Sequence, residues 1–483
     1  MTALEPVIGL EVHCQLETHS KLFSPCPLEI GAAPNTRTDP YTWGLPGTLP
    51  VLNREAVRKA IALALATHCE IHGESHFARK HYFYPDLPKG YQITQSDRPY
   101  ATGGHLDVPG AAPLRVRLQR IHLEEDAGKN LHVGRSSGVD YNRAGAPLLE
   151  IVSEPDLRSA EQAAAYLREL RALVRALGLS AANMEEGTLR CDANVSLRPR
   201  GQAALGVRCE IKNVNSFRFL ARAIEAEVAR QHDLLQQGRA IERCTLGFDG
   251  ERDRLFVMRS KEDAADYRYL PDPDLPPLSI SPAMIDAVRQ TLPELPADRR
   301  ARWTAAGVAT DDAQLLAAER ELADYFDATL AAATARRAQV PARRVAAWVV
   351  TELLGKLSAE GLPPSRCPIP PVALAELVVI VDDGTVSGRT GKDLFARLWQ
   401  GEPSAAAIAA REGLQQVSDT DAIDRTIAEI LAAHPQQLAA LRAGKDALRG
   451  FFVGQIMKAT RGQANPKLVA ERLDAAIAAG ASA

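Results

Sequence analysis

The pattern of apolar residues changes near residue 295, and this change limits the fold more than any other feature of the sequence. Residues 1 to about 290 alternate short apolar and polar stretches between Gly-, Pro- and Asp-rich turns, whereas the later residues are Ala-rich with a helical pattern. The proline-rich segment 270–278 lies beside the change and favours an extended linker. We expect an α+β multi-domain protein, with a mixed α/β domain over residues 1–292 built on an antiparallel sheet, followed by an all-α tail.

Composition narrows the class of protein. The chain has 483 residues, which is too long for a single compact core, so we expect two to four domains. Its composition, 46% hydrophobic and 24% charged, is typical of globular proteins. Neither a signal peptide nor a stretch long enough to cross a bilayer is evident, which favours a cytoplasmic protein away from membranes. The seven cysteines are scattered without a Cys-x-x-Cys pair, so neither a disulfide framework nor a zinc ribbon is indicated.

Two helices of the first region have clear boundaries. Ser159 and Gln162 have the spacing of a capping box, and an apolar stripe runs from there to Gly178. A second stripe predicts a helix from near Asn215 to Gly238.

Three predicted strands carry acidic and basic side chains on one face. They are Val7–Leu16, Leu189–Leu197 and Val207–Lys212, in which every second residue is apolar. The opposite faces carry polar residues: Glu11, His13, Gln15, Arg190, Asp192, Asn194, Ser196, Arg208, Glu210 and Lys212. Alternation alone is more often the solvated side of an antiparallel sheet than a functional site.

Other acidic residues favour a metal site over a merely solvated face. Glu124, Glu125 and Asp126 are consecutive, as are Glu185 and Glu186, and grouped carboxylates repel one another unless a cation neutralises them. The pair Glu-x-His at 11 and 13 adds a compact set of ligands, and oxygen-rich sets suit Mg²⁺.

Phosphoryl transfer requires such a site together with basic residues that meet phosphate charge. Five basic residues are available: Lys80, Lys89, Lys129, Arg190 and Lys212. No Walker A loop accompanies them, because Gly391-Lys392 is followed by Asp393 and lacks the preceding glycine. If the protein uses ATP, it does so without a P-loop.

Two segments have the character of RNA-binding surfaces. The run 79–92 interleaves aromatic and basic residues, as single-strand binding requires, although a loop flanking the core explains it equally well. Residues 434–483 carry a local excess of basic side chains, which suits a phosphate backbone but is also typical of a solvated helix face. The segment 259–269 resembles the first run in composition.

Whole phrases of the sequence resemble the B subunit (GatB) of the bacterial Asp/Glu-tRNA amidotransferases. The similar phrases span nearly the whole chain: 7–14 (VIGLEVHC), 20–23 (SKLF), 45–50 (LPGTLP), 82–92 (YFYPDLPKGYQ), 124–129 (EEDAGK), 139–145 (VDYNRAG), 184–195 (MEEGTLRCDANV), 210–217 (EIKNVNSF) and 451–466 (FFVGQIMKATRGQANP). Several of them exceed ten residues, so chance similarity is excluded.

The resemblance implies an architecture and an activity. It implies a catalytic cradle domain (1–292), a helical domain (293–405) and a YqeY-like tail domain that contacts tRNA (406–483). The implied reaction is ATP- and Mg²⁺-dependent phosphorylation of the side-chain carboxylate of Glu-tRNA(Gln) or Asp-tRNA(Asn), followed by amidation. The implied partners are the amidase subunit GatA, which supplies ammonia from glutamine, and the small subunit GatC in a heterotrimer, besides the misacylated tRNA.

The resemblance also assigns roles to residues at matching positions. The implied metal ligands are Glu11, His13, Glu124, Glu125, Glu185, Glu186, Asp192 and Glu210. The implied catalytic residues, which meet phosphate or carboxylate charge, are Lys80, Lys89, Arg190 and Lys212. The implied nucleotide-binding residues are Lys129 and Asn194. A ligase for a small free acid and a subunit that only tethers tRNA are the competing interpretations, and the long basic tail argues against the first.

Two departures from the family pattern limit the comparison. Some members carry a zinc-binding Cys-x-x-Cys pair where this chain has Tyr41-Thr-Trp-Gly44, so Cys26 has no cysteine partner and zinc is not expected. Residues 240–258 also depart from the family phrase, which leaves the contacts of that loop open.

Overall fold

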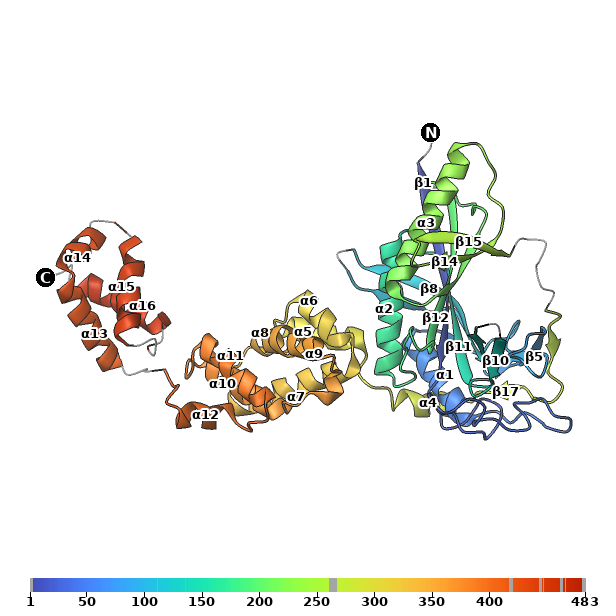
Figure 1. Cartoon of the computed structure of the whole chain (residues 1–483), viewed down its shortest axis with the longest axis horizontal. Helices are drawn as coiled ribbons and strands as arrows, with labels where there is room; N and C mark the ends of the chain where they lie inside the picture. The colour runs from blue at the N-terminus through green and yellow to red at the C-terminus, as the bar shows by residue number, and fades with distance from the viewer. Residues whose placement is uncertain are drawn as a thin grey trace. The chain divides into compact units, whose positions relative to one another are not determined.

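A computed structural model of the chain describes residues 3–110, 112–134, 136–259, 267–416, 420–442, 445, 447–460, 464 and 466–479. The chain divides into two compact units, Met1–Pro296 and Ala297–Ala483. The first contains the sheets, and within the described part of the second every regular element is helical, which confirms the α+β prediction (Figure 1).

The first unit is built on a ten-stranded sheet with the order β15-β14-β13-β12-β1-β11-β8-β6-β2, to which β7 adds by pairing with β8. Its strands are β1 (Leu4–Gln15), β2 (Glu70–Ile71), β6 (Ala101–Thr102), β7 (His105–Val108), β8 (Leu114–Glu125), β11 (Pro147–Ser153), β12 (Leu189–Pro199), β13 (Cys209–Val214), β14 (Thr245–Asp249) and β15 (Arg254–Arg259). All neighbouring pairs are antiparallel except β13 and β14, which are parallel.

Three small sheets lie outside this one. They pair β3 (Glu74–Ser75) with β17 (Leu278–Ser279), β4 (Ala78–His81) with β5 (Tyr91–Thr94) and β16 (Leu270–Pro271), and β9 (Lys129–Val133) with β10 (Ser136–Asp140). The prediction of an extended linker at 270–278 is therefore wrong. Both ends of that segment pair with strands of the first unit, and the buried Asp272 accepts a 2.9 Å hydrogen bond from Arg79 Nε.

Four helices belong to the first unit: α1 (Arg54–Ala66), α2 (Ala160–Ala176), α3 (Phe217–Gln236) and α4 (Pro282–Arg289). Ser159 caps α2 by accepting a hydrogen bond from the backbone N–H of Gln162, as the capping-box spacing predicts. Ser216 caps α3 in the same way. Both predicted helices are confirmed, and Figure 1 shows α2 and α3 along the sheet, where α3 packs on β12.

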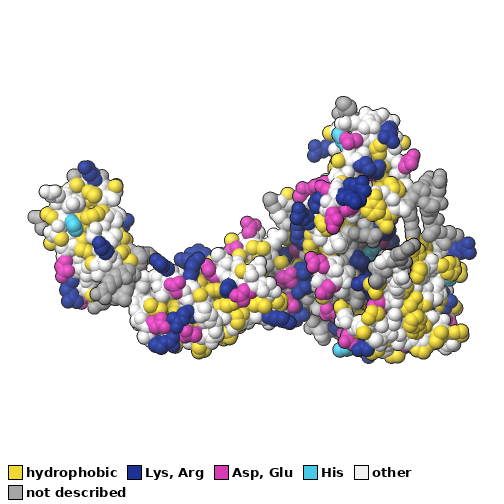
Figure 2. Space-filling view, viewed as in Figure 1, with side chains coloured by type: hydrophobic (Ala, Val, Ile, Leu, Met, Phe, Trp, Pro, Cys, Tyr) yellow, Lys and Arg dark blue, Asp and Glu magenta, His cyan; other side chains and the backbone are white. Residues whose placement is uncertain are grey.

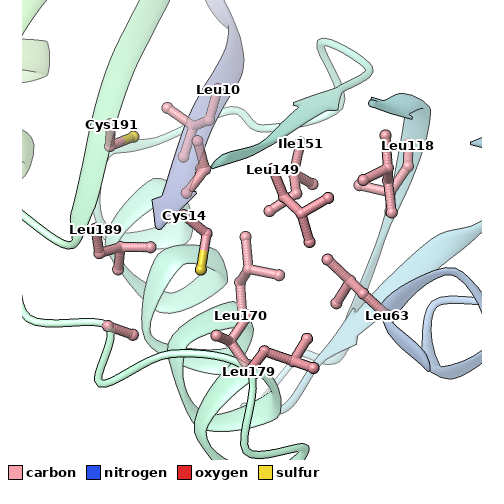
Figure 3. Close-up of a cluster of buried hydrophobic side chains, with 14 of the residues drawn as sticks. Leu10, Cys14, Leu63, Leu118, Leu149, Ile151, Leu170, Leu179, Leu189 and Cys191 are labelled. Carbon is pink, nitrogen blue, oxygen red and sulfur yellow. The ribbon is translucent and has the colours of Figure 1, made fainter. Parts of the chain in front are cut away.

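The apolar faces of the central strands and these helices form one core. Figure 3 shows Leu10 and Cys14 of β1 with Leu149 of β11, facing Leu63 of α1 and Leu170 of α2. These side chains are at most 1% exposed. Because side chains alternate along a strand, burial of this face directs the odd-numbered residues of β1 to the opposite face.

The third predicted strand begins later than expected. β13 starts at Cys209 rather than at residue 207, and Val207 is 45% exposed. Cys209 and Ile211 are buried as predicted, so Glu210 and Lys212 still share the other face.

The second unit is helical. Its elements are α5 (Pro296–Ala305), α6 (Thr310–Ala317), α7 (Arg320–Arg336), α8 (Ala342–Ala347), the π-helix Trp348–Leu353, α9 (Leu354–Glu360), the 3₁₀ turn Pro364–Arg366, α10 (Pro371–Asp382), α11 (Gly388–Trp399), α12 (Ala405–Arg411), α13 (Thr420–Ala433), α14 (Pro435–Arg442), α15 (Ala447–Ala459) and α16 (Pro466–Ala479). Two apolar clusters are distinct, one from Trp303 to Ala409 and one from Ile423 to Leu473.

Charges of both signs are interspersed on the face drawn in Figure 2. Within the basic segment 434–483, Arg449 forms an ion pair with Asp474 and Arg472 one with Asp424, while Arg461 of the same segment lies outside the described residues. None of the described helices combines the length and the apolar character needed to span a membrane.

Candidate active site

The register of β1 brings together polar residues that are distant in sequence. His13 lies opposite Arg190 of β12 on one side and opposite Glu150 of β11 on the other. Glu11 lies opposite Asp192 of β12. Because all these side chains project from the face opposite the core, the sheet holds a contiguous row of acids and bases.

Glu11, His13 and Glu150 form the first candidate metal-binding group. His13 Nε2 lies 3.6 Å from an oxygen of each carboxylate. Burial raises the pKa of Glu11, and the nearby charge of Glu150 raises it further. Burial opposes protonation of His13, but Glu150 and the neighbouring acids overcome it and raise the pKa of that imidazole. Both shifts reflect an excess of negative charge at this group, which a bound cation would neutralise.

His122, Glu124 and Glu150 form a second group, deeper in the sheet. His122 Nε2 lies 3.4 Å from Glu150 Oε2 and 3.8 Å from Glu124 Oε2. Burial disfavours the imidazolium, yet the two carboxylates raise the pKa of His122 to about 9. Burial likewise disfavours the charged form of Glu150, yet His122 and His13 hold its pKa well below the ordinary range. Glu150 belongs to both groups and connects them.

Lys80 and Lys89 approach the carboxylates from the side of β4 and β5. Lys89 forms an ion pair with Glu125, and its Nζ is 3.0 Å from the Tyr41 hydroxyl. The backbone N–H of Ile93 also donates to Glu125. Lys80 lies over the Tyr267 ring at 4.9 Å; burial opposes its charge, but Glu124 raises its pKa. Glu125 is thus engaged by Lys89 rather than by the two histidine groups.

Arg190 is held by Asp126. Its guanidinium donates a 2.9 Å hydrogen bond to Asp126 Oδ2, and Arg143 lies 3.6 Å from the same oxygen. Burial raises the pKa of Asp126, but the two arginines outweigh burial and lower it. Arg143 also donates to the backbone carbonyls of Ala127 and Gly128, so this corner of the sheet presents two fixed positive groups.

Lys212 is held in the same manner on β13, the strand beyond β12. Its Nζ lies 2.6 Å from Asp192 Oδ2 and 2.9 Å from Glu210 Oε1. Burial disfavours the ammonium, but the two carboxylates raise its pKa. Asn194 lies opposite Glu210 in the β12–β13 ladder. Asp192 and Glu210 therefore bind a lysine and are not members of the two histidine groups.

A cleft of about 910 Å³ opens beside this row of residues. Its basic lining consists of Lys129, Arg143, Arg190 and Lys212, and its acidic lining includes Asp192, Glu185 and Glu186. His13 also lines it, whereas Lys80, Lys89 and Asn194 are not among the lining residues. Glu185 and Glu186 are exposed in the turn before β12, away from the two groups. The volume is sufficient for a ligand the size of a nucleotide.

The donor set fits a divalent cation of the hard class. Glu11, Glu150 and Glu124 supply carboxylate oxygens, and His13 supplies an imidazole. In the buried group, His122 Nδ1 has no hydrogen-bond partner within the described structure. The half-exposed group with His13 borders the cleft, so it is the better position for a cation that meets a ligand there.

Sequence reasoning did not identify Glu150 or His122. Glu150 interrupts the otherwise apolar run 147–152, and a lone carboxylate in a buried central strand requires a partner. His122 repeats the one-residue spacing to a glutamate that marks Glu11 and His13. These two signals were sufficient to name Glu150 and His122 as candidate site residues. The contact of Glu150 with His13 could not be predicted, because the two residues are far apart in the sequence.

The sheet with its acidic and basic cleft, followed by a helical region, defines a multi-domain α+β enzyme subunit. Residues 6–286 match the family model of the GatB/GatE catalytic domain, and residues 324–477 match the GatB domain. The chain therefore belongs to the family of the B subunit of the aspartyl/glutamyl-tRNA(Asn/Gln) amidotransferases.

Curated relatives agree over nearly the full length. The chain is 48% identical to the B subunit of the aspartyl/glutamyl-tRNA(Asn/Gln) amidotransferase of Persephonella marina over 467 residues, covering 96% of this chain and 98% of the relative. It is 50% identical to the protein of the same name from Halorhodospira halophila over 474 residues, with 97% and 98% coverage. The Geobacter sulfurreducens protein is 48% identical over 476 residues, with the same coverage as the second. The resemblance noted from the sequence is confirmed.

Proposed function

We propose that this chain activates the side-chain carboxylate of Glu-tRNA(Gln) or Asp-tRNA(Asn) with ATP and Mg²⁺, so that ammonia can convert it to the amide. The observation that carries the proposal is the Glu11–His13–Glu150 group at the edge of a cleft lined by basic side chains. Membership of the amidotransferase family supports it. The activity is that of a carbon-nitrogen ligase, placed in the cytoplasm with the translation machinery.

The chemistry explains why such a site needs both acids and bases. A carboxylate reacts poorly with ammonia because oxide is a poor leaving group. Transfer of the γ-phosphoryl group of ATP to a carboxylate oxygen releases ADP and gives an acyl phosphate. Ammonia then forms the C–N bond while the C–O bond to phosphate breaks, so that phosphate and the amide are the products. Positive groups stabilise the charge on the transferred phosphoryl oxygens.

The residues divide between cation binding and phosphate binding. Glu11, His13 and Glu150 would hold Mg²⁺, which would neutralise phosphate charge when bound. Arg190 of β12 and Lys212 of β13 approach the same cleft from neighbouring strands, and their bonds to Asp126 and Asp192 fix their side chains before a ligand arrives. This fixed arrangement avoids reorganisation during transfer.

Other predicted residues take supporting roles in this proposal. Lys129 and Arg143 extend the basic rim of the cleft. His122 lies between Glu124 and Glu150 and neutralises charge on both carboxylates. Lys80 and Lys89 lie among the carboxylates on the β4 side, where they balance negative charge. We retain Asn194, Glu185, Glu186 and Glu210 as predicted site residues of lesser weight.

The proposal includes partners and a division of the chain. The amidase subunit GatA would hydrolyse glutamine to supply ammonia, and the small subunit GatC would complete a heterotrimer. We assign catalysis to residues 1–292, a helical domain to 293–405 and a YqeY-like tRNA-binding domain to 406–483. Two separate apolar clusters in the helical unit support two domains there, although Ile408 and Ala409 of α12 belong to the first cluster.

The test is hydrolysis of γ-labelled ATP by this chain assembled with GatA and GatC, with and without Glu-tRNA(Gln). Stimulation by the charged tRNA is expected in the wild type and is expected to disappear in Glu11→Gln. Glu70→Gln is the matched control, because Glu70 is an exposed carboxylate at the far edge of the sheet. Wild-type complex that binds the charged tRNA without ATP cleavage would instead identify a tethering role.

A further inference from the structure

Two cysteines lie in contact beside the candidate active site. Cys209 opens β13, and Cys244 immediately precedes β14. Their Sγ atoms are 3.5 Å apart. Both are free thiols in the structure; Cys209 is buried and Cys244 is half-buried.

The backbone places the two cysteines at equivalent positions of neighbouring strands. β13 and β14 are parallel, with Glu210 opposite Thr245, so Cys209 and Cys244 occupy the equivalent preceding positions. The Glu210 N–H donates a 3.0 Å hydrogen bond to the Cys244 carbonyl. Neighbouring strands lie about 4.8 Å apart, and disulfides join Cα atoms roughly 4.4 to 6.8 Å apart. Only a small side-chain movement separates the thiols from bonding distance.

The surroundings distinguish the two sulfurs. Cys209 Sγ donates to the Glu242 carbonyl at 3.4 Å and accepts from the Arg230 guanidinium at 3.4 Å. Burial, followed by the charge of Glu227, raises the pKa of the Cys209 thiol to about 12. Cys209 is therefore held as a thiol within the protein, while the half-buried Cys244 meets solvent first.

We propose that Cys209 and Cys244 form a redox modification site, at which a peroxide converts the two thiols reversibly into an intrachain disulfide. The proposal goes beyond the amidotransferase function and does not depend on it. It rests on the contact between the sulfurs and on the parallel register that places the two cysteines side by side on neighbouring strands.

The reaction balances with hydrogen peroxide as the oxidant. The Cys244 thiolate attacks one peroxide oxygen, so that an S–O bond forms, the O–O bond breaks, and the departing hydroxide takes up the thiol proton to become water. The Cys209 sulfur then attacks the Cys244 sulfur; the S–S bond forms, the S–O bond breaks, and the leaving hydroxide takes up the Cys209 proton to become a second water. Two thiols lose two electrons and two protons, and a dithiol reductant reverses the change.

The disulfide would connect the β14–β15 hairpin covalently to the strand that carries Lys212. Lys212 and Val214 of β13 line the cleft, and β14 is the sheet neighbour of β13 on the side away from β12. In the reduced chain, only noncovalent contacts hold this hairpin against β13. The cross-link therefore fixes the outer edge of the sheet next to the cleft.

The experiment treats the full-length chain with hydrogen peroxide, alkylates the remaining thiols and maps the peptides by mass spectrometry. Trypsin releases Cys209 within the peptide 209–212 and Cys244 within the peptide 244–252, because Arg208 and Arg243 precede them. We expect these two peptides to be joined, with the loss of two hydrogen atoms, and to separate after dithiothreitol. Cys244→Ser is expected to abolish the joined species, and Cys367→Ser, at another half-buried cysteine, to leave it unchanged.

Other outcomes would overturn the proposal. These are sulfinic acid on Cys244 with Cys209 still alkylated, a disulfide between two copies of the chain through Cys244, or no oxidation of either residue at peroxide levels that oxidise the other half-buried cysteines. Because Cys244 is not in the buried core, Cys244→Ser is expected to fold. Its circular dichroism spectrum, compared with that of the wild type, checks this point.

Discussion

His122 Nε2 lies 3.4 Å from Glu150 Oε2 on the neighbouring strand, and the two side chains are only 4% and 9% exposed. A buried pair of this kind is stable only while both partners are charged or both are neutralised. Their opposite pKa shifts express this coupling, since the imidazolium and the carboxylate each stabilise the other against burial.

The pair predicts how the stability of the metal-free chain depends on pH. The pKa of His122 is about 9 in the folded chain against an ordinary value of 6.5, so its contribution is complete below about pH 6.5 and is lost as pH rises through 9. The pKa of Glu150 is lowered, so its contribution is present above the ordinary glutamate range and is lost as pH falls through the lowered value.

The measurement is the thermal midpoint of the chelator-treated chain between about pH 6 and 9.5, a range that spans the ordinary and the raised pKa of a histidine. We expect the midpoint to fall over this range in the wild type and to fall less in His122→Gln, which cannot carry the charge. Equal slopes in the two proteins would contradict the assignment. Since a bound cation requires neutral imidazole ligands, the prediction applies only to the metal-free chain.

Glu150→Gln is predicted to weaken cation binding while preserving side-chain shape. Glu150 supplies oxygens to both histidine groups, so loss of its charge removes a ligand and releases His13 and His122 at once. We expect the affinity for Mn²⁺, used as a probe for Mg²⁺, to fall by at least about tenfold. Calorimetric titration with and without ATP measures the change. Unaltered Mn²⁺ affinity in Glu150→Gln, with Glu70→Gln as the reference, would place the cation elsewhere.

The contrast between Glu11 and Glu150 indicates what the sequence could and could not provide. Period-two alternation places Glu11, His13 and Asp192 on polar faces, and burial of the other face confirms this. The contact between His13 and Glu150 depends on which strands become neighbours and in which register. No local pattern determines that pairing. The prediction of a linker at the proline-rich segment 270–278 was wrong for a related reason, because the pairing of this segment with β4 and β3 is also long-range.

Lys212→Met is predicted to impair the use of ATP more than the binding of tRNA. The substitution removes an ammonium that lies 2.6 Å from Asp192 and 2.9 Å from Glu210, and it leaves the carboxylate of Asp192, which lines the cleft, without that positive charge. Phosphate groups would then meet uncompensated negative charge. We expect the KM for ATP in the assembled complex to rise by about tenfold or more, with partial rescue by Lys212→Arg. An unchanged KM, alongside a wild-type Kd for Glu-tRNA(Gln), would remove Lys212 from the phosphate-binding set.

Two adjacent glycines provide a matched test of how the end of α1 is attached to the sheet. Gly103 and Gly104 both have left-handed backbones, with φ of 65° and 87°. A Cβ at Gly104 would lie 2.5 Å from the Thr67 carbonyl oxygen and 2.6 Å from Cys69 Sγ, whereas a Cβ at Gly103 would meet nothing within 4 Å. The Gly104 carbonyl also accepts a 3.0 Å hydrogen bond from Leu118 of β8, so the close approach cannot relax without disturbing that strand.

Gly103→Ala therefore carries only the cost of a left-handed alanine, about 1 to 2 kcal/mol. Gly104→Ala carries the same cost plus that of displacing backbone atoms, which adds on the order of 1 to 3 kcal/mol. The measurement is hydrogen-exchange protection of the β8 amides in the two variants. Protection should fall further in Gly104→Ala, because its clash acts on the turn that holds Leu118. Equal protection in both variants would mean that the helix and the sheet can separate at this turn without cost, contrary to the close packing of Thr67 and Cys69 against Gly104.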